Sequence, residues 1–348
     1  TEEERQSIPY YNQFNLERGG AVPPPSSPVR TRAEWEEIQS LIVTWEGFST
    51  IQSQIVYHAK QECEVIIVTE DSVSTKNTLT NNGVDFVNIT FIEAPLNSVW
   101  VRDFGPWNVY TNDVDSLLIV DWIYNRPRPN DDVVPELIAN YKGLPIYPMT
   151  SPPYDLVHTG GNFMVDGQGT GFSSRLILDE NWNGSFNISN HNEAAIDTLM
   201  KQFMGIDRYI KFDELPYDLI HHIDMHMKLL DEETMLLGEY PTGVADGPQI
   251  NANLTYLLDN YNSIFGTPYK IIRMLMPPDQ NDRYPDNNGD YRTFTNAVFI
   301  NKTILVPIYE EQYDTTALRI WREAMPGYKI VGIDCDAMIW ASGALHCI

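Results

Sequence analysis

The residue best suited to nucleophilic chemistry in this chain is Cys347, which follows His346 in the run ASGALHC. A lone cysteine is more often a buried packing residue, since cysteine is among the most buried residue types. Three upstream stretches favour a chemical role, because each places Asp, Asn or His in or beside an apolar, strand-like run. They are WVRDFGPW (100–107), TGGNFMVDG (159–167) and HHIDMHMK (221–228).

The side chains in these stretches suit an attack on a guanidinium group, which is planar, cationic near neutral pH and carries five donors in a fixed fork. Two carboxylates are able to hold such a group through charge-assisted hydrogen bonds, and the candidates are Asp103 and Asp224. A Cys347 thiolate would add to the central carbon. His222 would protonate the departing ammonia and later activate water.

Two of these stretches also have a purely structural interpretation. Asp103 follows Arg102, and the two could form a buried ion pair that caps a turn at Gly105–Pro106. The GGN run at 160–162 could be a tight turn before a strand, in which glycine supplies backbone freedom.

A metal site is a further alternative for the third stretch. If HHIDMHMK is a strand, side-chain alternation puts His222, Asp224 and His226 on one face, a ligand set that would suit zinc or non-haem iron. The sequence has no second His or Glu cluster with the spacing of a metallohydrolase, and a metal would leave Cys347 unexplained. We therefore expect a metal-independent site.

Composition excludes several classes of protein. The chain has 348 residues, 43% of them hydrophobic, which is enough for a full core in one large domain or two smaller ones. Its 23 basic and 48 acidic residues give a net charge of −25, which disfavours nucleic acid and favours cationic partners.

Without an apolar stretch of 18 residues or a signal-like start, we expect a soluble protein that does not bind membranes. The three cysteines lack CxxC spacing, so we expect neither a zinc knuckle nor a disulfide framework, and at least one cysteine should remain a thiol.

The chain is organised as a proline-rich arm followed by a repeated pattern. Residues 1–31 have little periodicity and predict an extended surface arm, and a folded body begins near Arg32. Five units then follow, each with a helical apolar spacing before a short β-branched strand. Their helix and strand ranges are 51–63 with 64–70, 133–143 with 144–149, 193–205 with 206–212, 250–266 with 269–275, and 315–327 with 328–334. Four stretches between them predict hairpins, at 106–124, 162–178, 227–240 and 297–309. A repeat of this length predicts an α/β propeller in which charged side chains from distant segments meet at the centre.

From about Ala33 to Cys347, the chain resembles the bacterial, Porphyromonas-type peptidylarginine deiminases, which are guanidino-group modifying enzymes with the pentein fold. The matching motifs are WVRDFGPW, DWIYNRPRPNDD (121–132), HTGGNFMVDG (158–167), HIDMHMK (222–228), FTNAVFINKTILVP (294–307), MPGYKIVG (325–332) and GALHC (343–347). The resemblance implies an α/β fold, a five-bladed propeller of ββαβ units with pseudo-fivefold symmetry, in a single catalytic domain over residues 32–348.

The resemblance also implies roles for the candidate residues. Cys347 would be the nucleophile, His222 the general acid and base, and Asp103 with Asp224 the guanidinium clamp. Asn296, in the FTN run, matches a further active-site asparagine. The resemblance implies that no metal or other cofactor is needed.

Substrate choice depends on the run YNRPRPNDD at 124–132. Arg126 and Arg128 match residues that would hold the α-carboxylate of a carboxy-terminal arginine, since a guanidinium fork binds a carboxylate bidentately. Trp100 would flank the bound side chain. At the rim of the pocket, Ile220 lies where the family has a tyrosine just before the catalytic histidine. The alternative is a solvated basic loop in which the arginines pair with Asp131 and Asp132.

The sequence therefore predicts a cysteine-dependent hydrolase that converts arginine to citrulline and ammonia through a covalent thiouronium intermediate. Its partners would be peptides or proteins with a carboxy-terminal arginine. Two alternatives stay open, namely deimination of agmatine or free arginine, and an inactive propeller that only binds arginine-containing ligands. The resemblance and the proline-rich arm imply a secreted or periplasmic bacterial protein.

Overall fold

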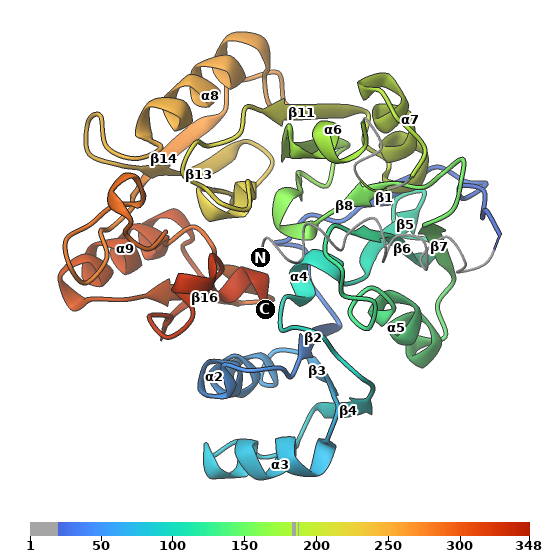
Figure 1. Cartoon of the computed structure of the whole chain (residues 1–348), viewed down its shortest axis with the longest axis horizontal. Coiled ribbons are helices and arrows are strands. Elements are labelled where there is room, and N and C mark those ends of the chain that lie inside the picture. The colour runs from blue at the N-terminus through green and yellow to red at the C-terminus, as the bar shows by residue number, and fades with distance from the viewer. Residues whose placement is uncertain (1–19, 183–185, 187) are drawn as a thin grey trace. The chain divides into compact units, whose positions relative to one another are not determined.

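The structure is a computed structural model that describes residues 20–182, 186 and 188–348. Figure 1 shows the course of the chain with its elements labelled. By its internal contacts, the chain divides into two compact units. The first unit consists of Thr1–Ala33 and Arg102–Phe212, and the second of Glu34–Val101 and Asp213–Ile348. The described residues contain five sheets, two in the first unit and three in the second. This division does not test whether residues 32–348 act as one catalytic domain, which stays a prediction.

One sheet of the second unit is parallel throughout, and its strands alternate with helices. Residues 65–68, in the central strand, are completely buried apolar side chains, as is typical of a parallel strand covered on both faces. The Asp71 side chain caps the second helix by accepting hydrogen bonds from the backbone nitrogens of Val73 and Ser74. The order is β2 (Ser40–Thr44), α2 (Ser49–Ala59), β3 (Glu64–Thr69), α3 (Ser72–Asn81) and β4 (Ile89–Glu93).

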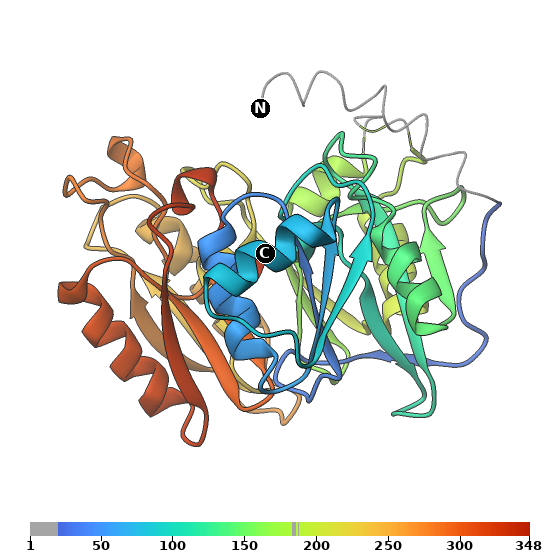
Figure 2. The same cartoon turned by 90° about the horizontal axis from the view of Figure 1, so that it is seen from below.

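The other two sheets of the second unit each form a ββαβ unit, in which an antiparallel hairpin leads through a helix to a parallel third strand. Helix α9 packs against β16 and β17, as the red helix of Figure 2 shows. The first sheet contains β12 (Met227–Leu229), β13 (Thr234–Glu239), α8 (Gly247–Asn260) and β14 (Lys270–Leu275), and the second β15 (Val298–Ile300), β16 (Thr303–Ile308), α9 (Glu311–Ala324) and β17 (Lys329–Asp334). Single 3-10 turns complete this unit, at η2 (Ile223–Met225), η3 (Pro285–Asn287), η4 (Ile339–Ala341) and η5 (Leu345–Cys347).

The first unit repeats the ββαβ pattern twice, with additions. Its larger sheet contains β5 (Trp107–Thr111), β6 (Leu117–Tyr124), α5 (Val134–Lys142) and β7 (Ile146–Met149), with β1 (Val29–Thr31) antiparallel to β5 and β8 (Val157–His158) parallel to the end of β6. Its smaller sheet contains β9 (Met164–Val165), β10 (Thr170–Ser174) and β11 (Arg208–Phe212), with α6 (Leu176–Glu180) and α7 (Glu193–Met204) between the last two strands. The short α4 (Val101–Phe104) and the turn η1 (Gly160–Asn162) lie outside the sheets.

Helix α7 anchors the core of the first unit. Its buried apolar side chains recur at helical spacing, at residues 196, 199, 200 and 203. The Asn192 side chain caps its first turn, and Gly205 ends it with φ +69°. A Cβ on Gly205 would lie 1.9 Å from the carbonyl oxygen of Val29, so only glycine permits this approach between the helix end and the arm.

The predicted helix-strand pairs are all present, with boundaries that differ by a few residues. The end of the second predicted hairpin was wrong, since residues 176–178 are the start of helix α6. The β2–β4 sheet, for which no hairpin was predicted, is parallel throughout. The end of the predicted arm pairs as strand β1, and residues 1–19 of the arm lie outside the described residues. None of the three cysteines forms a disulfide, as expected. No helix in the described part of the chain is long and apolar enough to cross a membrane.

Candidate active site

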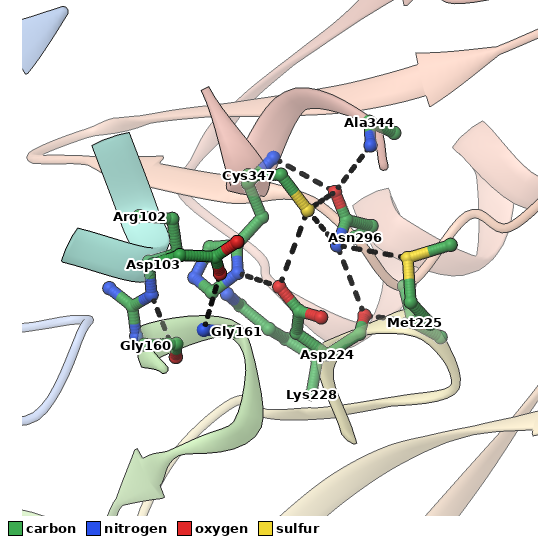
Figure 3. Close-up of polar contacts among 12 residues, drawn as sticks. Arg102, Asp103, Gly160, Gly161, Asp224, Met225, Lys228, Asn296, Ala344 and Cys347 are labelled. Atoms are coloured by element: carbon green, nitrogen blue, oxygen red, sulfur yellow. Dashed lines mark hydrogen bonds and ion pairs between the residues drawn. The ribbon is translucent and has the colours of Figure 1, made fainter. Parts of the chain in front are cut away.

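The thiol of Cys347 lies between an amide and a carboxylate of the second unit (Figure 3). Its side chain is buried in the turn η5. The Nδ2 atom of Asn296 lies 3.4 Å from the Sγ atom, and the Oδ2 atom of Asp224 lies 3.8 Å from it. A protonated thiol is able to donate to the carboxylate, and a thiolate is able to accept from the amide. The site therefore has a partner for either protonation state of the cysteine.

Asn296 fixes the turn that carries the cysteine. Its Oδ1 atom accepts hydrogen bonds from the backbone nitrogens of Ala344, at 3.2 Å, and His346, at 3.0 Å. Its Nδ2 atom also lies 3.5 Å from the carbonyl oxygen of Asp224 and 3.6 Å from the sulfur of Met225. One fully buried side chain thus connects the Cys347 turn to the Asp224 turn.

Asp224 is fully buried and keeps its negative charge through a row of charged groups. Its Oδ2 atom lies 2.7 Å from Nδ1 of His346, and Nε2 of the same ring lies 2.9 Å from Oε1 of Glu34. Glu34 in turn accepts a hydrogen bond from the Lys228 ammonium. Burial alone would raise the pKa of Asp224, but the hydrogen bond and charge of His346, with the charges of His222 and Lys228, hold that pKa below its usual range. The carboxylate is therefore available to bind a cation.

His222 is buried and lies directly before the turn η2. Its positive charge is one of those that lower the pKa of Asp224, so the two side chains are electrostatic neighbours. The predicted strand at this position was wrong. Residues 223–225 form a 3-10 turn and β12 begins only at Met227, because the chain turns to present both residues before it joins the sheet.

His226 is buried at the end of the turn that carries Asp224. Both of its ring nitrogens are buried without a hydrogen-bond partner among the described residues. Burial lowers its pKa to about 4, so the ring is neutral near pH 7. In the described part of the chain, no three His, Cys, Asp or Glu side chains are arranged to hold a metal ion.

Trp100 packs against the turn that carries Cys347. A Cβ on Gly343 would lie 2.5 Å from Cζ3 of Trp100 and 3.2 Å from Cβ of Cys347. Only glycine permits this contact between the indole and the Cys347 turn. The Trp100 ring is also close to Phe48, with ring centroids 6.4 Å apart. That Trp100 flanks the substrate stays a prediction.

In the first unit, residues 102–107 of the WVRDFGPW stretch and the TGGN stretch form one substructure around Asp103. The carboxylate of Asp103 is buried and accepts a hydrogen bond from the backbone nitrogen of Gly161 at 3.2 Å, as Figure 3 shows. Arg102 donates to the carbonyl oxygen of Gly160 at 3.2 Å and lies over the ring of Trp107. A Cβ on Gly160 would lie 1.9 Å from the carbonyl oxygen of Arg102, which confirms that glycine is needed there for backbone approach. The GGN turn also contacts Asp103, because the backbone nitrogen of Gly161 donates to its carboxylate.

The predicted arginine pair surrounds a buried tyrosine in the same unit. Arg128 donates to the hydroxyl of Tyr124 at 3.0 Å, with its guanidinium 5.9 Å from the ring centroid, and Arg126 donates to the carbonyl oxygen of Asn125 at 3.3 Å. Burial and the charge of Asp103 raise the pKa of Tyr124, while the charges of both arginines oppose this rise. The charges of Asp103, Arg126 and Arg128 therefore all act on the Tyr124 hydroxyl. Both arginines are half-buried.

Most of the predicted site residues thus form two groups, one in each unit. Asp103, Arg126 and Arg128 belong to the first unit. The second unit brings together Cys347, His222, Asp224, Asn296 and Trp100. Ile220 lies half-buried in the loop before η2, where its backbone nitrogen donates to Asp218 at 3.0 Å. Sequence reasoning gave no role to Glu34, His346 or Lys228, although the position of His346 next to Cys347 was a signal.

Known proteins resemble this chain over most of its length. The family model of the Porphyromonas-type peptidyl-arginine deiminases matches residues 30–348. A protein of Legionella pneumophila (strain Paris), with the provisional name agmatine deiminase, is 26% identical over 283 residues, which cover 75% of this chain and 74% of that protein.

Solved structures share the fold at low identity. A structure from Porphyromonas gingivalis, provisionally named an arginine deiminase, has a TM-score of 0.79 and 20% identity, and covers 92% of this chain and 96% of its own. The agmatine deiminase of Enterococcus faecalis has a TM-score of 0.77 and 20% identity, with coverage of 95% and 98%. These likenesses confirm the predicted pentein fold. The match over residues 30–348 shows that the chain belongs to the Porphyromonas-type peptidyl-arginine deiminase family, and that it is a hydrolase of the deiminase type.

Proposed function

We propose that this protein deiminates the guanidino group of a carboxy-terminal arginine, with Cys347 as the nucleophile. The observation that carries this proposal is the position of the Cys347 thiol, 3.4 Å from the amide of Asn296 and 3.8 Å from the carboxylate of Asp224. A cation held by Asp224 would present its central carbon to the sulfur. The resemblance assigns the same clamping role to Asp103 of the first unit.

The first half of the reaction forms a covalent intermediate. The thiolate of Cys347 adds to the guanidinium carbon, and a carbon–nitrogen bond breaks as His222 supplies a proton to the departing ammonia. The product of this half is an S-alkyl thiouronium on the enzyme. Asp224 stabilises the positive charge that remains on the substrate carbon and nitrogens.

The second half releases the product. His222, now neutral, accepts a proton from water, and the resulting hydroxide adds to the thiouronium carbon. The carbon–sulfur bond then breaks, which regenerates the thiolate and leaves a ureido group on the substrate. The balance is one guanidinium and one water consumed, with one neutral ureido group and one ammonium ion formed.

Arg126 and Arg128 support the choice of a substrate with a carboxylate. Both are half-buried, and their charges and that of Asp103 all act on Tyr124, so the first unit holds a carboxylate suited to a guanidinium and two guanidinium groups suited to a carboxylate. Arginine at the end of a peptide carries both groups. The net charge of −25 would also favour the approach of basic peptides, in a way that salt weakens.

Agmatine is the second candidate substrate. The relatives that match about three quarters of this chain carry the name agmatine deiminase, and agmatine has a guanidinium but no carboxylate. With agmatine, the chemistry at Cys347 would be the same, and Arg126 and Arg128 would have no substrate group to bind.

The experiment that tests this proposal measures ureido product from three substrates at equal concentration, with and without a chelator. The substrates are a peptide ending in arginine, a peptide with internal arginine, and agmatine. We expect the highest kcat/KM for the first and no effect of the chelator. A preference for agmatine would retain the thiol chemistry and contradict the carboxylate-binding role, and no turnover of any substrate would contradict the deiminase proposal.

A further inference from the structure

The ring of His346 lies between two carboxylates. Its Nδ1 atom is 2.7 Å from Oδ2 of Asp224, and its Nε2 atom is 2.9 Å from Oε1 of Glu34. The side chains of His346 and Asp224 are almost completely buried, and that of Glu34 is 16% exposed. Both nitrogens of one buried ring thus face oxygens that accept hydrogen bonds.

This geometry determines the protonation state of the ring. A neutral imidazole has one N–H group and is able to donate to only one of the two carboxylates, whereas an imidazolium donates to both. The other way to satisfy both contacts is a protonated carboxylic acid on one side. The charges of His222 and Lys228, which favour the ionised form of Asp224, oppose this on one side, and the Lys228 ammonium, which donates to Glu34, opposes it on the other.

We propose that His346 is a positioning residue that carries a permanent positive charge in the resting enzyme and holds Asp224 ionised and oriented toward Cys347. The proposal deepens the proposed function, since it rests on Asp224 as the group that binds the substrate cation. The charges then alternate along the row Lys228, Glu34, His346 and Asp224. A cationic substrate would bind at the anionic end of this row.

The backbone of His346 also connects it to the cysteine turn through Asn296. Its own nitrogen donates to Oδ1 of Asn296 at 3.0 Å, and the same asparagine approaches the Cys347 sulfur through Nδ2. The residue that orients the carboxylate is therefore the residue before the nucleophile, and both are fixed by one amide. A shift of His346 would displace Asp224 and Cys347 together.

Several charged groups face this row and would contribute to any pH dependence. Asp224 and Glu34 contact the His346 ring directly, and Lys228 contacts Glu34. His222 acts on Asp224 through its charge, and the Cys347 sulfur lies 3.8 Å from the same carboxylate. His226 also interacts with Asp224, but burial keeps it neutral near pH 7. A kinetic pH profile alone would thus contain several titrations, and a direct probe of the ring is needed.

The direct test is a nitrogen-15 NMR spectrum of histidine-labelled protein at about pH 7, in which the imidazolium and the two neutral tautomers have distinct patterns. His346→Gln identifies the resonances by their loss. We expect both ring nitrogens of His346 to carry protons, and a neutral tautomer would overturn the proposal. The NMR spectrum does not depend on turnover. It can therefore contradict the charge on His346 even if the protein is a deiminase, whereas variants that lack the Cys347 thiol test the deiminase reaction itself.

The kinetic test compares three full-length variants by the pH profile of kcat/KM. His346→Gln removes the cation beside Asp224, so we expect the acidic limb to move upward by about one pH unit or more, with kcat/KM lowered at least about tenfold below that limb. Glu34→Gln retains an oxygen that accepts from Nε2 but removes a charge, and we expect a smaller loss in the same direction. His226→Gln is the matched control, because it removes a buried histidine that is neutral. The acidic limb of its pH profile should stay where it is in the wild type. A packing defect would lower kcat/KM without moving the acidic limb of the pH profile, and this result for His346→Gln would contradict the positioning role. If His346→Gln does not fold, an unmoved acidic limb in Glu34→Gln would contradict that role equally.

Discussion

The Asn296 side chain contacts the Cys347 sulfur with its amide nitrogen and holds the backbone of the cysteine turn with its amide oxygen. One residue therefore both stabilises a negative sulfur and determines where that sulfur lies. This dual contact explains why an amide is needed at this position. A carboxylate would repel a thiolate, and an apolar side chain would leave the buried backbone nitrogen of Ala344 without its acceptor.

Replacement of this amide tests the role of the contact. Asn296→Asp keeps the shape and the acceptor oxygen but places a negative charge beside the thiolate. We expect kcat to fall by about 100-fold, within the range measured when a donor that stabilises developing charge is removed. The thermal midpoint separates this from unfolding, since a folded variant with unchanged kcat would contradict the role of Asn296.

Loss of the thiol should abolish turnover without unfolding the protein. Cys347→Ala removes one buried sulfur and no backbone contact, so we expect ureido product at the level of the uncatalysed control. Chloroacetamidine, an amidine that resembles guanidinium, should alkylate Cys347 in the native protein, with a thioether formed and chloride released. All three cysteines are buried, but Asp224 lies 3.8 Å from the Cys347 sulfur and would hold the amidine there, so we expect Cys63 and Cys335 to react more slowly. Peptide mapping identifies the site, and preferential labelling of either other cysteine would contradict the assignment.

The arginine pair should discriminate between substrates. Arg126→Ala removes one candidate partner for the α-carboxylate, so we expect kcat/KM to fall by about 10- to 100-fold for a peptide ending in arginine and by much less for agmatine. Arg319→Ala is the matched control, because it removes an exposed arginine on helix α9 that pairs only with Glu323 among the described residues. Equal losses on both substrates would assign Arg126 a structural role.

Asp218 should make the fold less stable as the pH rises. Burial raises its pKa to about 8, from an ordinary value of 3.8, because its carboxyl group is surrounded by protein and by the charges of Asp246 and Asp224. The folded chain thus holds a proton that the unfolded chain releases above about pH 4, and stability falls between these two values. We expect Asp218→Asn to raise the thermal midpoint by a few degrees at about pH 8 and by little at about pH 4. A constant difference at both pH values would contradict the buried, protonated state.

The helices and strands could be predicted from sequence because their signals are local. Helix α7 shows its apolar spacing within twelve residues, and the buried run 65–68 is visible as four consecutive β-branched residues. The turn at 223–225 was missed because alternating apolar and polar residues predict a strand, and only tertiary contacts of Asp224 favour the 3-10 conformation.

The candidate site could be predicted only in part, for a similar reason. Cys347, His222, Asp224 and Asn296 lie in motifs, and their types suggest their chemistry. The contact from His346 to Glu34 joins residues 312 positions apart, and that from His346 to Asp224 joins residues 122 apart. No local pattern marks a glutamate as the partner of a distant histidine, so this row of charges required the fold.

The most direct test of the central claim is the mass of the enzyme during turnover. Wild-type protein would be mixed with a peptide ending in arginine, quenched in acid within the first turnovers, digested and analysed by mass spectrometry. We predict that the peptide containing Cys347 carries the substrate minus one ammonia, and that the adduct is absent from Cys347→Ala. Turnover to ureido product without any adduct on Cys347, or with an adduct on another residue, would contradict the proposed mechanism.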